Sequence, residues 1–427
     1  MWVGAPTTIL CMSAELPTYE QAAAMLAAYA RRLGPLSRKI ESVKLTNATG
    51  RVLARAVTAD EDQPPFTRST RDGYACRATD LSTQEPLHVT GMTHAGEAPA
   101  PALNEGAAWE IMTGSAVPEG ADAVVMLEHV ERSGDGIRLL AGRTLKAGDN
   151  IVARGAQARR GEELLHAGAM LGPAQIAVAA SCGCEVLDVY ARPRVAILTT
   201  GDELVPVEAT PGPGQIRNSN APMLETLVSA AGGEPWVLPT VGDTAEALDE
   251  ALRTVQSNGA DLLLISGGVS AGKFDLVEPA LKRAGARFHF TGVRIQPGKP
   301  LVFGEVSVRE RMSPFFGLPG NPISSAATFL LFGAPMLQAL AGREFAEPCF
   351  VMARLKEPTD RNAKTGLTRF LPARCELSRG NGELQVATVP WHGSGDLPAF
   401  GRSNCFVVVP DDVSSLEAGS MVRILMV

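Results

Sequence analysis

The stretch VAILTTGDEL (residues 195–204) decides the fold that this sequence predicts. Its first half, Val195–Thr200, is a continuous apolar and β-branched run, typical of a strand buried on both faces of a sheet. Its second half turns at Gly201 and presents two adjacent carboxylates, Asp202 and Glu203. In open α/β sheets, ligands bind beyond the carboxyl ends of such strands. The stretch therefore predicts an α/β sheet with a functional site at a strand end.

Strand-like and helix-like segments alternate on the C-terminal side of this stretch. The strand-like segments are residues 236–241, 262–265, 287–295 and 301–303. The helix-like segments are residues 221–231, 245–255 and 276–284. Such alternation indicates βαβ units. We therefore expect residues 193–342 to form an α/β domain with a doubly wound parallel sheet.

The N-terminal half has a different texture. Helices are expected at residues 18–33 and 174–181, each after a helix-start signal. Between them, short β-like runs are separated by Gly and Pro, and residues 124–131 and 137–140 flank a hairpin turn at Ser133–Gly136. The economical interpretation is a β-rich domain, residues 60–153, inserted into a helical and extended framework made of residues 12–59 and 154–192.

The pattern becomes β-like again after Gly342. Strands are expected at residues 350–355, 368–377, 384–389, 405–409 and 421–426, with a hairpin signal at Asn381-Gly382. Residues 346–427 are therefore expected to form a small C-terminal β-barrel domain. The predicted fold class is α/β multidomain.

Composition excludes several classes of protein. In the 427 residues, 45% are apolar and 20% charged, which is normal for a soluble globular chain. The net charge of −7 argues against broad nucleic-acid binding, which needs a basic surface. No run of eighteen apolar residues predicts a membrane span, and the N-terminus lacks the basic region of a signal peptide. We expect a cytoplasmic protein, with Met12 as an alternative start because clear patterning begins near Leu16.

The seven cysteines are odd in number and scattered. No pair of CxxC motifs is present, so neither a zinc site nor a disulfide framework is expected. Cys182 and Cys184 form the only close pair in the sequence, and reduced buried thiols are favoured over a redox or metal role.

Carboxylates follow two of the expected strands. Glu203 comes directly after the first strand, and Asp243 follows the strand at residues 236–241. Carboxylates at strand ends suit Mg²⁺, which prefers one or two carboxylates plus substrate oxygens. A solvated turn acid is the alternative for Glu203. Asp243 with Glu246 also fits a capping box, and composition alone favours that capping role over metal binding.

A glycine loop follows the strand at residues 262–265. It includes Ser266, Gly267, Gly268 and Ser270, and Asp275 stands at the entrance of the next helix. Glycines allow close approach of the backbone, whose N–H groups can hold a phosphate. The strand–loop–helix context strengthens a motif that is weak by itself.

Two rigid Pro/Gly turns complete the candidate site. They are PGKP (residues 297–300), which contains Lys299 and Pro300, and GLPGNP (residues 317–322), which contains Asn321. Lys299 suits a point-charge contact with an anion, whereas the alternative is simply two tight turns. Together, the carboxylates predict a divalent cation, the glycine loop a phosphate and Lys299 a second anion. The pattern indicates chemistry on a phosphorylated ligand.

These stretches resemble the MoeA / gephyrin E-domain family of molybdopterin molybdenumtransferases. The motifs that carry the resemblance are TGDELV, GQIRNSN, SGGVSAGKFD, PGKP and GLPGNPIS, preceded by PPF (64–66), RDGYA (71–75), IMTG (111–114) and PEGADAVV (118–125) and followed by GSG (393–395) and SNC (403–405). They extend from about Leu16 to the C-terminus, and as a set they are highly specific.

The resemblance implies an elongated homodimer of four-domain subunits with a MogA-like α/β domain. It implies a transferase that takes adenylylated molybdopterin and molybdate, uses Mg²⁺ to cleave the pyrophosphate link, and leaves molybdenum on the dithiolene. Carried over by motif, the residues serving Mg²⁺ and phosphate are Glu203, Asp243 and Asp275, those around molybdate are Lys299, Pro300, Arg369 and Ser394, and those reaching in from the partner's inserted domain are Asp72 and Thr113. Other molybdenum cofactor biosynthesis proteins are possible partners.

Five positions depart from the family pattern. Gln296 precedes PGKP and Gly292 lies four residues earlier, at two positions that are often basic. Gln157 replaces an acid, and Thr70-Arg71 precedes DGYA. Arg294 is the nearby cation, and strand alternation places it on the same face as Gln296. These changes alter the charge of the anion site. They therefore bear on its affinity for the anion and on its preference between molybdate and tungstate.

Two other functions compete with the enzyme interpretation. A non-catalytic carrier would bind molybdopterin or the molybdenum cofactor tightly without turnover. A scaffolding role like that of the eukaryotic relative is disfavoured, because no fused domain or disordered linker is visible. The acceptor molybdoenzyme is not encoded in these motifs.

Overall fold

The computed structural model describes residues 15–33, 39–82, 84–268, 276–309, 311–359, 365–380 and 382–427. The chain forms two compact units, one made of residues 1–41, 50–52 and 189–427 and the other of residues 42–49 and 53–188. The expected Ser270, Asp275, Asn381 and Met12 lie outside the described residues. The finer division into four domains stays a prediction.

The first unit contains a six-stranded mixed sheet with strand order β16-β13-β17-β21-β20-β18. In that order the strands are Glu234–Val237, Arg194–Thr199, Leu262–Ser266, Arg311–Leu318, Val302–Val308 and Arg287–Thr291. The α/β fold class is confirmed. The expected wholly parallel sheet is wrong at β20, which runs antiparallel to both β21 and β18. Only residues 309 and 310 separate β20 from β21, and a parallel pair needs a long crossover.

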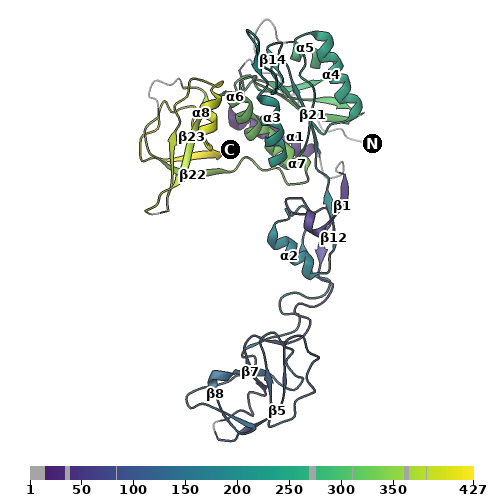
Figure 1. Cartoon of the computed structure of the whole chain (residues 1–427), viewed down its shortest axis with the longest axis vertical. Helices are drawn as coiled ribbons and strands as arrows, with labels where there is room; N and C mark the ends of the chain where they lie inside the picture. The colour runs from purple at the N-terminus through teal and green to yellow at the C-terminus, as the bar shows by residue number, and fades with distance from the viewer. Residues whose placement is uncertain are drawn as a thin grey trace, which may run out of the picture. The chain divides into compact units, whose positions relative to one another are not determined.

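Helices cover both faces of this sheet (Figure 1). One core contains side chains of α1 (Tyr19–Leu33), α3 (Asn220–Ala230) and the continuous helix α6–η4–α7. The parts of that helix are Pro322–Thr328, Phe329–Gly333 and Ala334–Leu340. The other core contains side chains of α4 (Ala245–Asn258) and α5 (Val277–Arg283). Strands β13 and β17 contribute to both cores, which explains their uninterrupted apolar sequences.

The helix at residues 322–340 is long and apolar enough to cross a membrane. Among the described residues it is the single helix that passes this test of length and composition, and 83% of its apolar window is buried inside the protein. A core helix passes the same test, and this one packs against β13 and β17 side chains and against α1.

The C-terminal part of the first unit is a closed barrel. Its five strands are β22 (Phe350–Leu355), β23 (Thr368–Leu377), β24 (Leu384–Thr388), β25 (Cys405–Val409) and β26 (Met421–Met426), as the sequence predicts, with α8 (Leu397–Arg402) before β25. The order β23-β24-β22-β26-β25 closes because β25 also pairs with β23. The short strand β19 (Ile295–Gln296) adds in parallel to β23, with Gln296 opposite Arg369.

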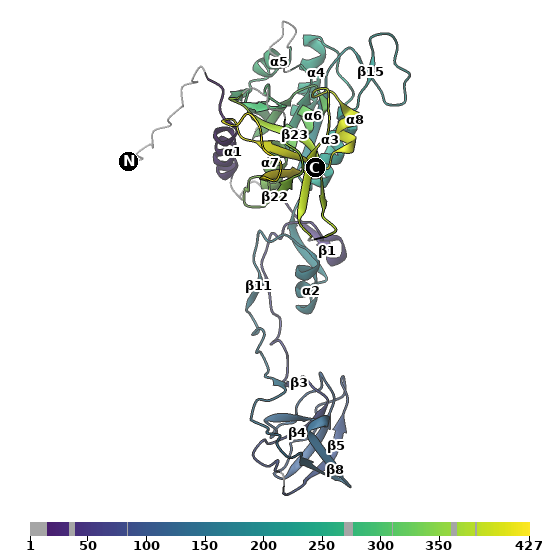
Figure 2. The same ribbon diagram turned by 90° about the vertical axis from the view of Figure 1, so that its left-hand side faces the viewer.

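The second unit contains a six-stranded sheet of order β7-β4-β6-β5-β9-β8 (Figure 2). In that order the strands are Ala123–Met126, Gly73–Cys76, Ala107–Ile111, Leu87–Thr93, Gly136–Leu139 and Val130–Ser133. The expected hairpin is confirmed for β8 and β9. Its first strand was predicted to be longer than it is, because residues 123–126 form the separate strand β7. The remaining elements between residues 40 and 190 are β1 (Ile40–Lys44), η2 (Leu45–Asn47), β2 (Val57–Thr58), β3 (Arg68–Ser69), η3 (Leu127–His129), β10 (Ile151–Val152), β11 (Glu163–Leu165), α2 (Pro173–Ser181) and β12 (Val186–Tyr190).

Gly73 of the DGYA motif is required by close packing of strands. A Cβ atom at this position would lie 1.9 Å from the carbonyl oxygen of Val125 on β7. Any side chain would push β4 away from β7, so the motif's glycine has a structural role.

We predict that Phe316→Ala destabilises the first unit by about 3–5 kcal/mol, because it leaves a cavity in a closed core. Phe316 on β21 is fully buried and stacks on Phe303 with ring centroids 5.0 Å apart. Urea unfolding followed by near-UV circular dichroism measures the change. The control Val207→Ala, at a side chain that is 56% exposed, should stay within about 0.5 kcal/mol. Equal losses in both variants would contradict this description of the core.

Candidate active site

The carboxyl ends of the parallel strands open into a cavity of about 780 Å³. Seven of the predicted site residues with described positions line it: Glu203, Asp243, Ser266, Gly267, Gly268, Pro300 and Asn321. The structure therefore brings together motifs that are far apart in the sequence, as expected for loops that follow neighbouring strands of one sheet.

Two of these loops are joined by hydrogen bonds. The N–H of Gly201 donates to the carbonyl of Val241 at 3.2 Å, and the N–H of Asp243 donates to Oδ1 of Asp202 at 3.0 Å. Asp202 is thereby used to hold the second loop. The exposed carboxylates of Glu203 and Asp243 remain on the lining of the same cavity. They provide the one or two carboxylates that Mg²⁺ requires, and the donor set fits that ion.

The capping role favoured for Asp243 is wrong. The N-cap of α4 is Thr244, whose Oγ1 accepts a hydrogen bond from the N–H of Ala247 at 3.3 Å. Ser, Thr, Asp and Asn all serve as N-caps, so the sequence Asp243-Thr244 offers two possible N-cap residues that are neighbours in the chain. Because the threonine caps the helix, the aspartate is available to the cavity.

The glycine loop is shaped by contacts within the protein. Gly267 has a φ of +103°, and a Cβ atom there would lie 2.5 Å from the carbonyl oxygen of Thr200. Gly268 has a φ of +61°, and its Cβ would lie 2.7 Å from Cγ2 of Val277. Both glycines are thus needed for the loop to pass over the end of β13. The remaining loop residues, including the expected Ser270 and Asp275, lie outside the described residues.

Two asparagines of the motif GQIRNSN organise this cavity, although no role was predicted for them. Asn218 is buried; its Nδ2 donates to Oγ1 of Thr199 at 2.8 Å, and its Oδ1 accepts from the N–H of Ala221 at 3.1 Å. Asn220 donates from Nδ2 to Oγ of Ser266 at 2.9 Å and to the carbonyl of Gly320 at 2.6 Å. Their amides therefore join three loops, a long-range role that leaves no local signal in a sequence.

Unsatisfied polar atoms mark the same cavity as a ligand site. Within the described part of the chain, Oγ1 of Thr200 and Oδ1 of Asn220 are buried without a hydrogen-bond partner. Both residues line the cavity. A buried acceptor or hydroxyl left unpaired costs free energy, so such atoms are often satisfied by a ligand or ordered water.

A second cavity, of about 1060 Å³, adjoins the first and is lined by Lys299, Arg369 and Ser394. Pro300, Pro319 and Asn321 line both cavities. The second cavity lies where β19 meets β23, so one wall comes from the PGKP turn and the other from the barrel. His392, Trp391 and Thr359 also line it and were not predicted, because only the folded barrel brings them to this place.

The two cationic side chains that line the second cavity differ in their exposure and in their hydrogen bonds. The side chain of Lys299 is exposed, and no carboxylate in the described ranges forms an ion pair with it. Arg369 is only 3% exposed. Its Nη2 donates to the carbonyls of Val413 and Ser414 at 2.8 and 2.7 Å. Arg369 is therefore held rigidly at the cavity wall.

The loop that contains Ser394 is fixed on both sides. Oγ of Ser394 accepts a hydrogen bond from Nδ2 of Asn321 at 2.8 Å, and its carbonyl accepts from the N–H of Ile323 at 3.0 Å. Asp396 caps α8 and also accepts from the N–H of His392 at 3.0 Å. The hydrogen bonds that Asp396 accepts from the backbone N–H groups of Ala399, which has the larger effect, and of His392 lower the pKa of Asp396 below its usual range. Asn321 thus links the GLPGNP turn directly to the serine.

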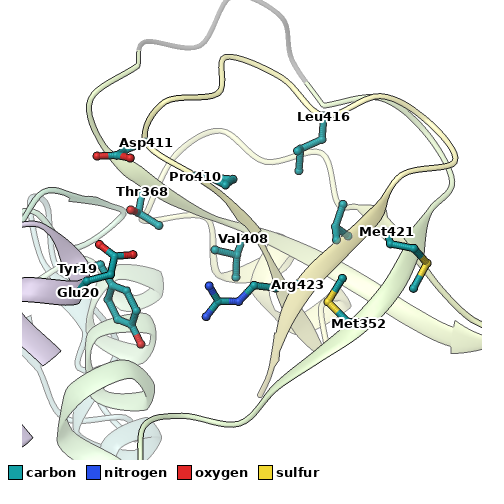
Figure 3. Close-up of a pocket in the computed structure, with 11 residues that line it drawn as sticks. Tyr19, Glu20, Met352, Thr368, Val408, Pro410, Asp411, Leu416, Met421 and Arg423 are labelled. Atoms are coloured by element: carbon teal, nitrogen blue, oxygen red, sulfur yellow. The ribbon is translucent and has the colours of Figure 1, made fainter. Parts of the chain in front are cut away.

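Arg294 does not supply the missing positive charge near Gln296. It forms ion pairs with Glu15 at 3.4 Å and with Asp411 at 3.6 Å, and its Nε donates to the carbonyl of Gly366. Asp411 belongs to a separate cavity of about 330 Å³ between α1 and the barrel (Figure 3). Strand alternation does not decide the side-chain direction here, because β19 begins only at Ile295.

Gly292 departs from the basic pattern for a steric reason. Its φ is +148°, and a Cβ atom would lie 2.8 Å from Cδ2 of Leu16 and 3.4 Å from the carbonyl oxygen of Lys299. In this chain a long basic side chain at residue 292 would displace Leu16. Gln157 lies exposed in the other unit, and Gln296 is exposed on the lining of the second cavity.

Asp72 and Thr113 belong to the second unit and lie side by side. Oδ1 of Asp72 accepts from both the N–H and Oγ1 of Thr113, at 2.7 and 2.8 Å. These two hydrogen bonds, the backbone one first, lower the pKa of Asp72 below its ordinary value. The two predicted residues are therefore hydrogen-bonded to each other, and both side chains are exposed; their role in the cleft of a partner subunit stays a prediction.

Comparisons with known proteins cover nearly the whole chain. Three family models match it: "MoeA N-terminal region (domain I and II)" over residues 17–183, "Probable molybdopterin binding domain" over 196–339, and "MoeA C-terminal region (domain IV)" over 354–427. The molybdopterin molybdenumtransferase of Nostoc sp. is 34% identical, with 90% of this chain and 88% of the relative aligned. That of Haemophilus influenzae is 32% identical, with 91% and 94% aligned.

A solved structure is also similar to this chain over nearly its whole length. The crystal structure of a molybdopterin biosynthesis moeA protein from Pyrococcus horikoshii OT3 is 29% identical and has a TM-score of 0.79. The similarity covers 97% of this chain and all of that one.

We predict that Thr113→Val raises the pKa of Asp72 towards its ordinary value of 3.8, because the hydroxyl donor is lost. A carboxylate whose pKa is lowered by folding stabilises the protein above its unfolded pKa, and this contribution disappears as the pH falls through the lowered value. Carbon-13 NMR titration of the Asp72 carboxyl measures the change. Thr113→Ser, which keeps the donor, should retain the low pKa. A titration unchanged in Thr113→Val would refute the assigned hydrogen bond.

Proposed function

The chain belongs to the MoeA family of molybdopterin molybdenumtransferases, and we propose that it inserts molybdenum from molybdate into adenylylated molybdopterin with release of AMP. This reaction is a step of molybdenum cofactor biosynthesis. The observation that carries the proposal is the pair of adjoining cavities, one lined by carboxylates and a glycine loop and the other by Lys299 and Arg369.

The first cavity suits the phosphoanhydride end of the substrate. Ser266, Gly267 and Gly268 line it, and the glycine motif that they begin would offer backbone N–H groups to phosphate oxygens, while Glu203 and Asp243 would hold Mg²⁺. Mg²⁺, when bound, neutralises phosphate charge and orients the oxygens of the leaving AMP. The unpartnered Oγ1 of Thr200 and Oδ1 of Asn220 are available to the substrate's polar groups. Ser270 and Asp275 keep the substrate and metal roles that the motif implies.

The second cavity suits the oxyanion. Molybdate is a small tetrahedral dianion, and Lys299 supplies an exposed ammonium without a competing carboxylate among the described residues. Ser394 offers a hydroxyl whose oxygen already accepts from Asn321, so its own proton is free to donate to an anion. Arg369 contributes fixed positive charge from the barrel wall, beside Pro300 of the PGKP turn. Tungstate, of nearly the same size and charge, would enter the same site.

Because the two cavities share lining residues, the proposal assigns one end of the substrate to each cavity. Asn321 and Pro300 line both, so a pterin that crosses this border would place its phosphates in the first cavity and its dithiolene near the oxyanion in the second. Holding both reactants in one geometry makes metal transfer effectively unimolecular.

The proposal includes a cytoplasmic homodimer, as the family implies. In such a dimer, the exposed pair Asp72 and Thr113 would serve the cleft of the partner subunit. The support in this chain is that the motifs RDGYA and IMTG bring these side chains together on the surface of the second unit.

A non-catalytic carrier of molybdopterin or of the molybdenum cofactor is the second candidate. It is favoured by the modest positive charge of the second cavity, where Gln296 replaces a basic residue and Arg294 is engaged elsewhere. Tight pterin binding without AMP release would support it.

We predict that the purified protein releases AMP from adenylylated molybdopterin when molybdate and Mg²⁺ are present. Glu203→Ala should lower the rate at least about 100-fold, because a metal-binding carboxylate in the cleft is lost. The matched control is Glu208→Ala, an exposed acid in the same segment, which should retain the wild-type rate. AMP is quantified by chromatography, with tungstate in a parallel series. Wild-type release no faster than that of Glu203→Ala would reject the enzyme and leave the carrier.

We predict that Lys299→Met raises the KM for molybdate about 10- to 100-fold, because a charge-assisted contact is removed while the aliphatic stem is kept. The control is Lys282→Met on α5, at a lysine whose Nζ pairs with Glu278 at 2.8 Å. Steady-state AMP release against molybdate concentration measures the effect. A KM unchanged in Lys299→Met would remove Lys299 from the oxyanion site.

A further inference from the structure

Three sulfur-containing side chains converge inside one end of the C-terminal barrel. They are Cys375 on β23, Cys405 on β25 and Met426 on β26. Cys405 is directly opposite Met426 across β25–β26, and it is opposite Ala373 across β23–β25, two residues from Cys375. Since alternate residues of a strand share a face, all three side chains lie on the inner face of the barrel.

The side chain of Cys375 contacts those of both other residues. Sγ of Cys375 donates to Sδ of Met426 at 3.7 Å. The side chain of Cys405 also forms a hydrogen bond with that of Cys375. Cys405 is fully buried and Cys375 is 6% exposed, whereas Met426 is 43% exposed. The thioether therefore lies between the two thiols and the solvent.

Asn404 holds the backbone around this cluster rigidly. The N–H of Cys375 donates to its Oδ1 at 2.8 Å, and its Nδ2 donates to the carbonyl of Cys375 at 2.9 Å. Its own N–H donates to the carbonyl of Ala373 at 3.0 Å, and its carbonyl accepts from the N–H of Val427 at 3.1 Å. One residue thus fixes all three strand ends that carry the sulfur atoms.

The surroundings of the cluster select the kind of ion. The two cysteines belong to an apolar core with Ala353, Val386 and Ile424. Across the described ranges, no third His, Cys, Asp or Glu joins them. Zn²⁺ takes four ligands in structural sites, and hard cations need oxygen. Thiolates with a thioether select Cu(I).

We propose that Cys375, Cys405 and Met426 bind one Cu(I) ion in a three-coordinate, sulfur-only site. Binding replaces the two thiol protons, which leave to solvent, and forms two copper–thiolate bonds and one copper–thioether bond. The ion keeps its oxidation state, so no oxidant or reductant is consumed. The site is separate from both cavities of the proposed molybdenum chemistry, since none of the three residues lines them.

The test is an anaerobic titration of the reduced full-length protein with Cu(I) against a chromophoric Cu(I) chelator. We expect one tightly held Cu(I) per chain and the release of two protons, measured with a pH indicator in weak buffer, because metal binding to thiols displaces their protons. X-ray absorption of the complex should show sulfur ligands alone. Failure to compete with the chelator, or nitrogen and oxygen ligands in the spectrum, would overturn the proposal.

Variants locate the ion. The double variant Cys375→Ala/Cys405→Ala should lose the tight site, and Met426→Leu should weaken it about 10- to 100-fold. Met426 is half exposed, so its replacement keeps the fold even where the double variant does not. The matched control is Cys182→Ala/Cys184→Ala, the other close cysteine pair, which should bind as the wild type does. Tight binding that persists in Met426→Leu, or that disappears in the control, contradicts the site. AMP release plays no part in this readout.

Discussion

The pairing of β19 with β23 is the interaction on which the candidate site depends. Only Ile295 and Gln296 form this strand, yet they attach the PGKP turn of the α/β sheet to the barrel strand that carries Arg369. The N–H of Thr368 donates to the carbonyl of Arg294 at 3.0 Å, and the N–H of Arg294 donates to the carbonyl of Pro17 at 2.8 Å. The N-terminal helix, the α/β sheet and the barrel therefore meet at one short segment. Lys299 and Arg369 share a cavity because of it.

Much of the fold follows from local pattern. Strands β13 and β17 are apolar throughout because they are covered on both faces, and such runs are readable in a sequence. The five barrel strands were also readable from alternation and turn residues. The direction of β20 was not, because a strand's residues do not encode the direction of its neighbour. Only the two-residue connection to β21 shows that the pair is a hairpin, and β21 itself was missed.

The residues of the candidate site also fall into two groups: those that the sequence pattern could place and those that it could not. Residues in loops directly after strands, such as Glu203 and Asp243, could be placed at one sheet edge from the βαβ pattern alone. Arg369 and Ser394 could be placed only by family resemblance, since their approach depends on how the barrel packs. The cap at Thr244 and the ion pairs of Arg294 were decided by side-chain geometry, which propensities do not resolve. The linking amides of Asn218 and Asn220 left no signal for the same reason.

The uncharged helix at residues 322–340 has a consequence for synthesis of the chain on the ribosome. Its apolar side chains share a core with Tyr19 near the N-terminus and with Phe406 and Leu425 near the C-terminus. Phe406 and Leu425 lie on β25 and β26, far along the chain from the helix, so this core is completed only after those strands have been synthesised. Until then the nascent chain exposes a long apolar helix, the kind of surface that chaperones bind.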